Sequence, residues 1–187
     1  MAKFFVFIEF KDAEVNGLIT GIREVVGTKA GQSNIHLTIR GPYSVPVSAA
    51  RLKSYQRLLE PHPVLLDGFG LFHSSNKTVV YMKAQHPMLR RIWWKPDFPI
   101  RKYGFNPHIT LYEGDDRGRA EHLKAFLEKE GLKLLVSKFQ VTGYVSDHTD
   151  LFPSNQSPDE PFLNLSLVGL VRPDILNRLK RAIRNVE

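Results

Sequence analysis

The sequence predicts an α+β fold in which antiparallel strands and outer helices form two similar lobes around a central cleft. Short runs with the alternation or apolar content typical of strands are interspersed with stretches of helical periodicity. A stretch of alternating polar and apolar residues occurs twice, 72 positions apart, at residues 34–40 and 106–112. Each copy is followed by a turn, a helix and further β structure, so the two halves of the chain repeat one order of elements.

The first elements are an apolar strand and two capped helices. Residues 4–10 are apolar and aromatic, which is typical of a strand buried on both faces. Asp12 is a suitable N-cap for a helix whose apolar residues recur at helical spacing as far as Gly27. After the first repeated stretch, Ser48 is a suitable cap for a second helix, which we expect to end before Pro61.

The middle of the chain predicts a hairpin followed by a short helix. Residues 64–73 and 77–84 read as two strands, because a polar turn composition separates them. Residues 86–94 have a helical pattern, and the proline-containing residues 95–99 then form a loop that leads to the second repeated stretch.

The last third predicts a helix, two strands and a final helix. A helix over residues 119–130 is expected to stop at Gly131, and one long strand is expected over residues 133–145. Residues 162–171 predict a further strand, and Asp174 begins an amphipathic C-terminal helix.

Composition predicts a globular protein with an anionic partner. The 187 residues are 42% hydrophobic and 24% charged, and no linker separates the halves, so we expect residues 1–187 to form one domain. A formal charge of +7 favours a nucleic acid or nucleotide partner. The lack of cysteine excludes disulfides, thiolate metal sites and a thiol nucleophile. We find neither a signal-peptide pattern nor a membrane-length apolar run, so we expect a cytoplasmic protein without membrane contact.

The two repeated stretches supply two imidazoles and two hydroxyls. Alternate side chains of a strand share one face, so His36 and Thr38 should lie together with the residue two positions further on, as should His108 and Thr110. One imidazole can take a proton from an attacking oxygen while the other protonates a leaving oxygen across a phosphorus atom. The threonines can donate hydrogen bonds to the non-bridging phosphate oxygens. Such a site needs no metal and no other cofactor.

This pattern resembles the 2H (two-histidine) phosphoesterase superfamily, whose members carry two His-x-Thr/Ser-x motifs with an apolar fourth residue. The corresponding motifs here are residues 36–39 and 108–111, and Pro107 also fits the pattern. The chain looks most like the bacterial group named for 2′-5′ RNA ligase and RNA 2′,3′-cyclic phosphodiesterase. The resemblance implies a bilobal α+β fold and metal-independent catalysis by the paired histidines and threonines.

The resemblance leaves the substrate contacts open. In many relatives the residue two past the second threonine is basic, whereas here the arginine follows the first motif as Arg40 and the second motif has Tyr112. Arg40 can clamp phosphate or form an ion pair at the rim, and Tyr112 can stack on a base, donate its hydroxyl or pack in the core. Further candidates for substrate binding, whose alternatives are core packing or solvated surface, are Tyr43, Trp93, Arg101 and Phe105.

From the sequence we therefore expect a monomeric, metal-independent phosphoesterase that hydrolyses 2′,3′-cyclic phosphates of RNA or nucleotides. Its enzymatic rivals are cleavage of 2′-5′ oligoadenylates or of cyclic oligonucleotides, and ligation of RNA through a 2′-5′ linkage. An RNA-binding module that keeps the scaffold without catalysis is the alternative from a different class. The sequence does not decide which histidine is the acid and which is the base.

Overall fold

The computed structural model describes residues 2–28, 35–74, 76–95, 97, 104–146 and 174–184, and shows an α+β fold with two antiparallel sheets. In chain order the elements are β1 (Lys3–Phe10), α1 (Ala13–Val25), β2 (His36–Tyr43), α2 (Ala49–Leu59), β3 (Val64–Ser74), β4 (Lys77–Gln85), α3 (Leu89–Trp93), β5 (His108–Gly114), α4 (Arg117–Glu130), β6 (Lys133–Val136), β7 (Phe139–Ser146) and α5 (Ile175–Arg184). No helix within these ranges is long and apolar enough to cross a membrane.

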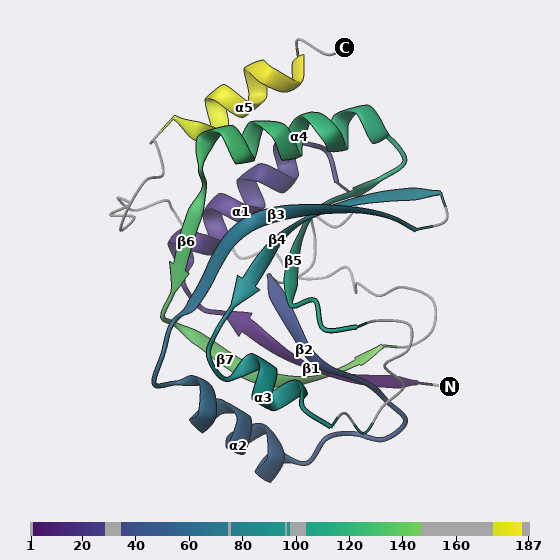
Figure 1. Ribbon diagram of the computed structural model, residues 1–187, viewed down its shortest axis with the longest axis vertical. Helices are drawn as coiled ribbons and strands as arrows, with labels where there is room; N and C mark the ends of the chain where they lie inside the picture. The colour runs from purple at the N-terminus through teal and green to yellow at the C-terminus, as the bar shows by residue number, and fades with distance from the viewer. Residues whose placement is uncertain are drawn as a thin grey trace.

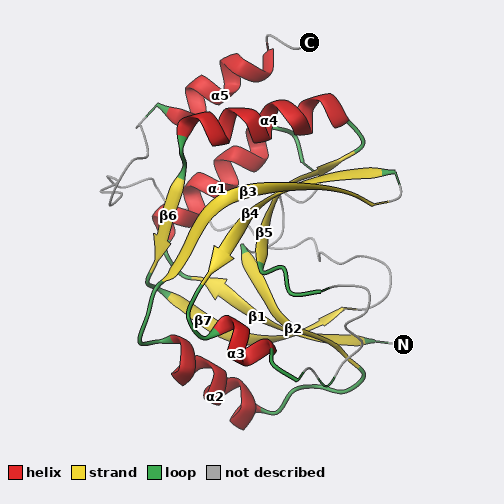
Figure 2. Ribbon diagram, viewed as in Figure 1, coloured by secondary structure: helices red, strands yellow, loops and turns green. Residues whose placement is uncertain are grey.

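The strands form a three-stranded sheet of order β2-β1-β7 and a four-stranded sheet of order β5-β4-β3-β6. The four-stranded sheet is strongly curled, and α4 packs on its β3 and β4 strands beside α5 (Figure 1). On the three-stranded sheet, α2 contacts β7 and α3 contacts β2 (Figure 2). In the described part of the chain, β2 and β5 are edge strands of their sheets, and they contact each other. The two strands that carry the repeated stretches are therefore neighbours.

The predicted helix caps of the first half are confirmed. Asp12 accepts hydrogen bonds from the backbone N–H groups of Glu14 and Val15 at 3.1 and 3.3 Å, which satisfies donors that the first turn of α1 leaves unpaired. Ser48 caps α2 in the same way.

The helices of the second half also form where the sequence predicts them. Helix α4 begins at Arg117, two residues earlier than expected, because Asp116 accepts a hydrogen bond from the Arg119 N–H at 2.8 Å. Gly131 ends the helix in the left-handed conformation with a φ of 64°. The buried apolar residues of helix α5 are Ile175, Leu179 and Ile183.

The prediction of one continuous strand over residues 133–145 is wrong. The segment forms β6, which pairs with β3, and β7, which pairs with β1 in the other sheet. Residues 137–138 carry the chain between the sheets, and the Lys138 carbonyl accepts a hydrogen bond from the Lys11 N–H at 2.8 Å. The strand predicted over residues 162–171 lies outside the described residues.

Helix α3 is shorter than the predicted 86–94. His86 lies outside the helix, and its ring forms hydrogen bonds with backbone groups. Its Nδ1 accepts from the Met88 N–H at 3.0 Å, and its Nε2 donates to the Leu59 carbonyl at 3.0 Å. The ring therefore ties the start of α3 to the end of α2.

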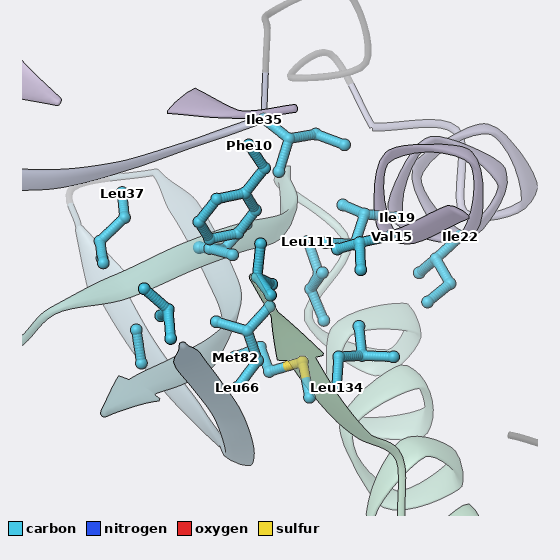
Figure 3. Packing of buried hydrophobic residues seen from close by; sticks show 14 of the residues in the cluster. Phe10, Val15, Ile19, Ile22, Ile35, Leu37, Leu66, Met82, Leu111 and Leu134 are labelled. Carbon is cyan, nitrogen blue, oxygen red and sulfur yellow. The ribbon is translucent and has the colours of Figure 1, made fainter. Parts of the chain in front are cut away.

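Leucine and isoleucine residues of both repeated stretches pack into a core shared by the two sheets and α1. Leu37, Ile109 and Leu111 are fully buried. Side chains from both sheets and from α1 converge there (Figure 3), and those labelled are Phe10, Val15, Ile19, Ile22, Ile35, Leu37, Leu66, Met82, Leu111 and Leu134. Burying a leucine side chain stabilises a fold by about 1.5–3 kcal/mol. Because one face of each strand packs in the core, the motif histidines and threonines lie on the opposite face.

Candidate active site

A cavity of about 360 Å³ contains the four motif side chains. His36 and Thr38 reach it from β2, and His108 and Thr110 reach it from β5. Its lining residues are Phe5, Phe7, Arg23, His36, Thr38, Ile39, Gly41, Pro42, Phe72, Leu89, Trp93, Gly104, Phe105, Asn106, Pro107, His108 and Thr110. The volume lies at the small end of the range for ligand pockets. Two edge strands from different sheets thus bring motifs that are far apart in sequence to one cavity.

The ring of His36 is held by an aromatic stack from the neighbouring strands. It lies over Phe7 of β1 with ring centroids 4.1 Å apart and planes inclined by 16°. Phe7 stacks in turn on Tyr144 of β7 at 4.9 Å. The stack spans all three strands of the sheet and restrains the imidazole plane.

His108 is held in one tautomer by the backbone that precedes it. Its Nδ1 lies 2.6 Å from the Asn106 carbonyl oxygen, and because a carbonyl only accepts hydrogen bonds, Nδ1 carries the proton. Tyr81 and Phe72 pack around the ring at 4.7 and 6.1 Å between centroids. Burial lowers the pKa of His108, and the bond to Asn106 only partly opposes this. The lowered pKa favours the neutral ring, in which Nε2 is the unprotonated nitrogen.

Arg40 does not lie on the cavity face, so the expectation that it accompanies His36 and Thr38 is wrong. The pairing of β1 with β2 runs from Val6–Arg40 to Phe7–Thr38, which leaves Ile39 as one extra residue on β2. This β-bulge turns Arg40 away from the side shared by the histidine and threonine. Arg40 is 3% exposed.

The guanidinium of Arg40 belongs to a structural network instead. It donates hydrogen bonds to the Ile92 carbonyl, to the Tyr43 hydroxyl and to Asp97. Tyr43 is buried as well and is not a cavity residue; burial raises its pKa to about 12, and its hydroxyl donates to Asp97 at 3.0 Å. Asp97 is also paired with Arg51 at 2.8 Å, and its hydrogen bonds with the arginines hold the pKa of its carboxyl well below the usual range. The network ties β2 to α2 and α3.

Tyr112 is displaced from the cavity by a bulge at the equivalent position of β5. The pairing with β4 runs from Val80–Tyr112 to Tyr81–Thr110, so Leu111 is the extra residue. Tyr112 is 3% exposed and its hydroxyl donates to the Asp116 carbonyl at 3.3 Å. Its position is that of a core residue.

Two aromatic candidates do line the cavity. The rings of Trp93 and Phe105 meet edge to face at 5.8 Å, and the Arg90 guanidinium lies over Phe105 at 5.4 Å. Phe105 is 39% exposed, so its ring is accessible for stacking. The candidate Arg101 lies outside the described residues.

Arg23 lines the cavity but was not among the residues that sequence reasoning singled out. It lies in the last turn of α1 and donates to the Thr110 carbonyl through Nε at 3.1 Å and Nη2 at 2.8 Å. Thr28 holds the same outer edge of β5, where its Oγ1 accepts from the Glu113 N–H at 2.8 Å. Its position four residues after Ile19 places Arg23 within the apolar stripe of the helix, and this pattern in the sequence could have identified it.

No metal-binding arrangement is found in the described ranges: they contain no group of three or more His, Cys, Asp or Glu placed to hold an ion. Comparison of the sequence with protein-family models and with curated proteins found no match.

Proposed function

We propose that this protein is a metal-independent phosphoesterase of the 2H type that hydrolyses 2′,3′-cyclic phosphates of RNA or nucleotides. One observation carries the proposal: both histidines and both threonines of the repeated motifs line a single cavity, although they come from two different sheets. In this proposal the two sheets, with their helices, are the lobes of a bilobal fold, and the cavity between β2 and β5 is the cleft.

The surroundings of the two histidines favour a division of roles. Burial favours the neutral form of His108, in which Nε2 is unprotonated, so we assign His108 as the base that takes a proton from the attacking water. The water oxygen bonds to phosphorus while the bond from phosphorus to one ribose oxygen breaks. His36, whose ring reaches the cavity from β2, donates a proton to that departing oxygen. The reaction leaves a phosphomonoester and exchanges the protonation states of the two rings.

The threonines supply hydrogen bonds to the phosphate. Thr38 and Thr110 each lie two residues after a histidine on the cavity face of the same strand, so each hydroxyl accompanies one imidazole. Donors placed where negative charge concentrates in the transition state lower the barrier.

The size and lining of the cavity favour a small substrate. A volume of about 360 Å³ with Trp93 and Phe105 on its wall suits one nucleotide, whose base can stack on an aromatic ring. We therefore favour a nucleotide or an RNA end over 2′-5′ oligoadenylates, cyclic oligonucleotides or a ligation substrate, which need the same catalytic groups and a longer groove. A cytoplasmic monomer remains the expectation for this enzyme.

Assays of EDTA-treated protein test the proposal. The substrates are 2′,3′-cyclic nucleotides, 2′-5′ dinucleotides and 3′-5′ dinucleotides as controls. We expect turnover of the cyclic phosphates, and we expect His36→Ala and His108→Ala each to reduce kcat by at least about a hundredfold, because each removes one proton-transfer step. His122→Ala is the matched control, since His122 is exposed on α4 and does not line the cavity.

Each outcome of these assays has a defined meaning. Full activity in either motif variant, with circular dichroism unchanged from the wild type, would refute the two-histidine mechanism. Binding of the substrates without turnover would favour the RNA-binding module. Faster cleavage of 2′-5′ dinucleotides than of cyclic phosphates would favour the oligoadenylate alternative.

A further inference from the structure

Arg23 occupies a core-facing position of α1. The buried residues of this helix are Val15, Leu18, Ile19, Ile22 and Arg23. Only 3% of Arg23 is exposed, and charged residues are rarely buried to this extent. A guanidinium therefore occupies a position where the pattern of the helix would otherwise place an apolar residue.

The guanidinium is fixed beside the second motif. Its Nε and Nη2 both donate to the carbonyl oxygen of Thr110, at 3.1 and 2.8 Å. Arg23 also lines the cavity that contains His36 and His108. Two donors of a planar group that converge on one carbonyl oxygen restrain its orientation, so the charge is presented to the cavity from a defined position.

The charge of the cavity favours an anionic ligand. Burial lowers the pKa of Arg23 to about 10, which still leaves the side chain charged at neutral pH. No aspartate or glutamate is among the described residues that line the cavity, and most of its wall is apolar or aromatic. A positive charge surrounded by such a wall interacts more strongly with an anion than the same charge would in water.

We propose that Arg23 is a phosphate-binding residue, which neutralises the anionic oxygens that the motif threonines contact only through neutral hydroxyl groups. This inference deepens the proposed function and rests on it, because it places a phosphate group in the cavity. Charge-assisted hydrogen bonds to phosphate are stronger than neutral ones, so the arginine would hold the substrate and stabilise the charge that develops during transfer.

Binding of inorganic phosphate to the full-length protein tests the inference without turnover. Isothermal titration calorimetry compares the wild type with Arg23→Gln, which keeps a donor for the Thr110 carbonyl but removes the charge, and with Arg23→Lys, which keeps the charge. We expect Arg23→Gln to weaken phosphate binding by about tenfold or more, as expected for loss of a charged hydrogen-bond donor. Arg23→Lys should retain more of the affinity than Arg23→Gln.

Arg119→Gln provides the matched control. Its guanidinium also donates to a backbone carbonyl, that of Val26 at 3.4 Å, but Arg119 does not line the cavity. This substitution should leave phosphate affinity unchanged. The KM for a cyclic nucleotide should follow the phosphate affinities of the three variants.

The inference is overturned if wild-type protein binds no phosphate, if Arg23→Gln binds it as tightly as wild type, or if Arg23→Lys and Arg23→Gln lose the same affinity. The last result would show that the geometry of the guanidinium, which neither variant keeps, matters and that the charge does not. Phosphate binding that depends on Arg23, without hydrolysis of any cyclic phosphate, would support the anion site and reject the proposed function.

A measurement on the wild type decides the question if Arg23→Gln does not fold. The side-chain Nε–H resonance of Arg23 can be assigned from its loss in the spectrum of Arg23→Lys. Addition of phosphate should shift this resonance, and a resonance that stays in place while phosphate binds would overturn the inference.

Discussion

At the scale of single residues, the two motif histidines differ in what surrounds them. His36 stacks on the face of Phe7, whereas His108 donates its Nδ1 proton to a backbone carbonyl and packs against Phe72 and Tyr81. Burial disfavours the charged form of His108. In the proposed mechanism, a neutral imidazole is suited to act as the base.

The pH dependence of activity should show the effect of burial on the pKa of His108. In the proposed mechanism the base must be neutral, so kcat/KM should rise with pH through the pKa of His108. Because burial lowers that pKa, the acidic limb of the wild-type profile should lie below 6.5, the ordinary imidazole value. Phe72→Ala admits water to the ring, so it should raise the pKa of His108 and move the acidic limb to higher pH.

Phe105→Ala is the control for this pH profile. Phe105 lines the same cavity, but its aromatic contact is with Trp93. The acidic limb should therefore stay in place in Phe105→Ala, whatever happens to KM. Equal displacement of the limb in both variants, or none in Phe72→Ala, would contradict the role of burial at His108.

At the scale of elements, the two motif strands share one irregularity. Each has an extra residue directly after its motif threonine, Ile39 in β2 and Leu111 in β5. A bulge reverses the alternation of side chains beyond it, so Arg40 and Tyr112 face the interior and not the cavity. The residue that follows each bulge therefore packs in the interior, where Arg40 anchors neighbouring elements and Tyr112 binds the Asp116 carbonyl.

Replacement of Arg40 distinguishes anchoring from phosphate binding. Arg40→Met removes the hydrogen bonds to the Ile92 carbonyl, Tyr43 and Asp97, so we expect the free energy of unfolding to fall by about 1–3 kcal/mol. The KM for a cyclic nucleotide should change little in the folded variant, because Arg40 is not a cavity residue. Urea denaturation and steady-state kinetics measure the two quantities.

Arg51→Met is the companion variant for this measurement. Arg51 pairs with the same Asp97 at 2.8 Å, but its side chain is 41% exposed, so its loss should cost less stability than the loss of Arg40. A large rise in KM for Arg40→Met without loss of stability would instead support the alternative in which Arg40 clamps phosphate.

At the scale of the whole molecule, the features that could be predicted from sequence are those that depend on neighbouring residues in the chain. Asp12 and Gly131 act within one turn of their own helices, and their roles were predictable. The break between β6 and β7 was not, because it depends on which distant strand each half pairs with. Arg23 was missed for the same reason, since its partner is the carbonyl of Thr110, which lies 87 residues away in the chain.

The arrangement of the two motifs was predictable only in part. The alternation of polar and apolar residues indicated that His36 and Thr38 share a face, and both line the cavity together with His108 and Thr110. Alternation could not indicate the bulges, because they arise from pairing with β1 and β4. The positions of Arg40 and Tyr112 were mispredicted on that account.

The shared core predicts that the two sheets unfold together. Leu37 comes from the three-stranded sheet and Leu111 from the four-stranded sheet, and both are fully buried in one hydrophobic cluster. Leu37→Ala and Leu111→Ala should each lower the free energy of unfolding by about 2–5 kcal/mol. Each should also shift one cooperative transition, because neither sheet keeps its apolar face covered once the other has unfolded.

Urea unfolding followed by far-ultraviolet circular dichroism and by tryptophan fluorescence checks this prediction. The first signal reports both sheets, while the second reports Trp93 and Trp94 at the end of α3, beside the three-stranded sheet. Val145→Ala on β7 is the matched control, because Val145 is 47% exposed and its truncation should change stability by less than about 0.5 kcal/mol. Two separate transitions, or a leucine variant that displaces only one of the signals, would show that the lobes fold independently and that the cavity between β2 and β5 joins two separate domains.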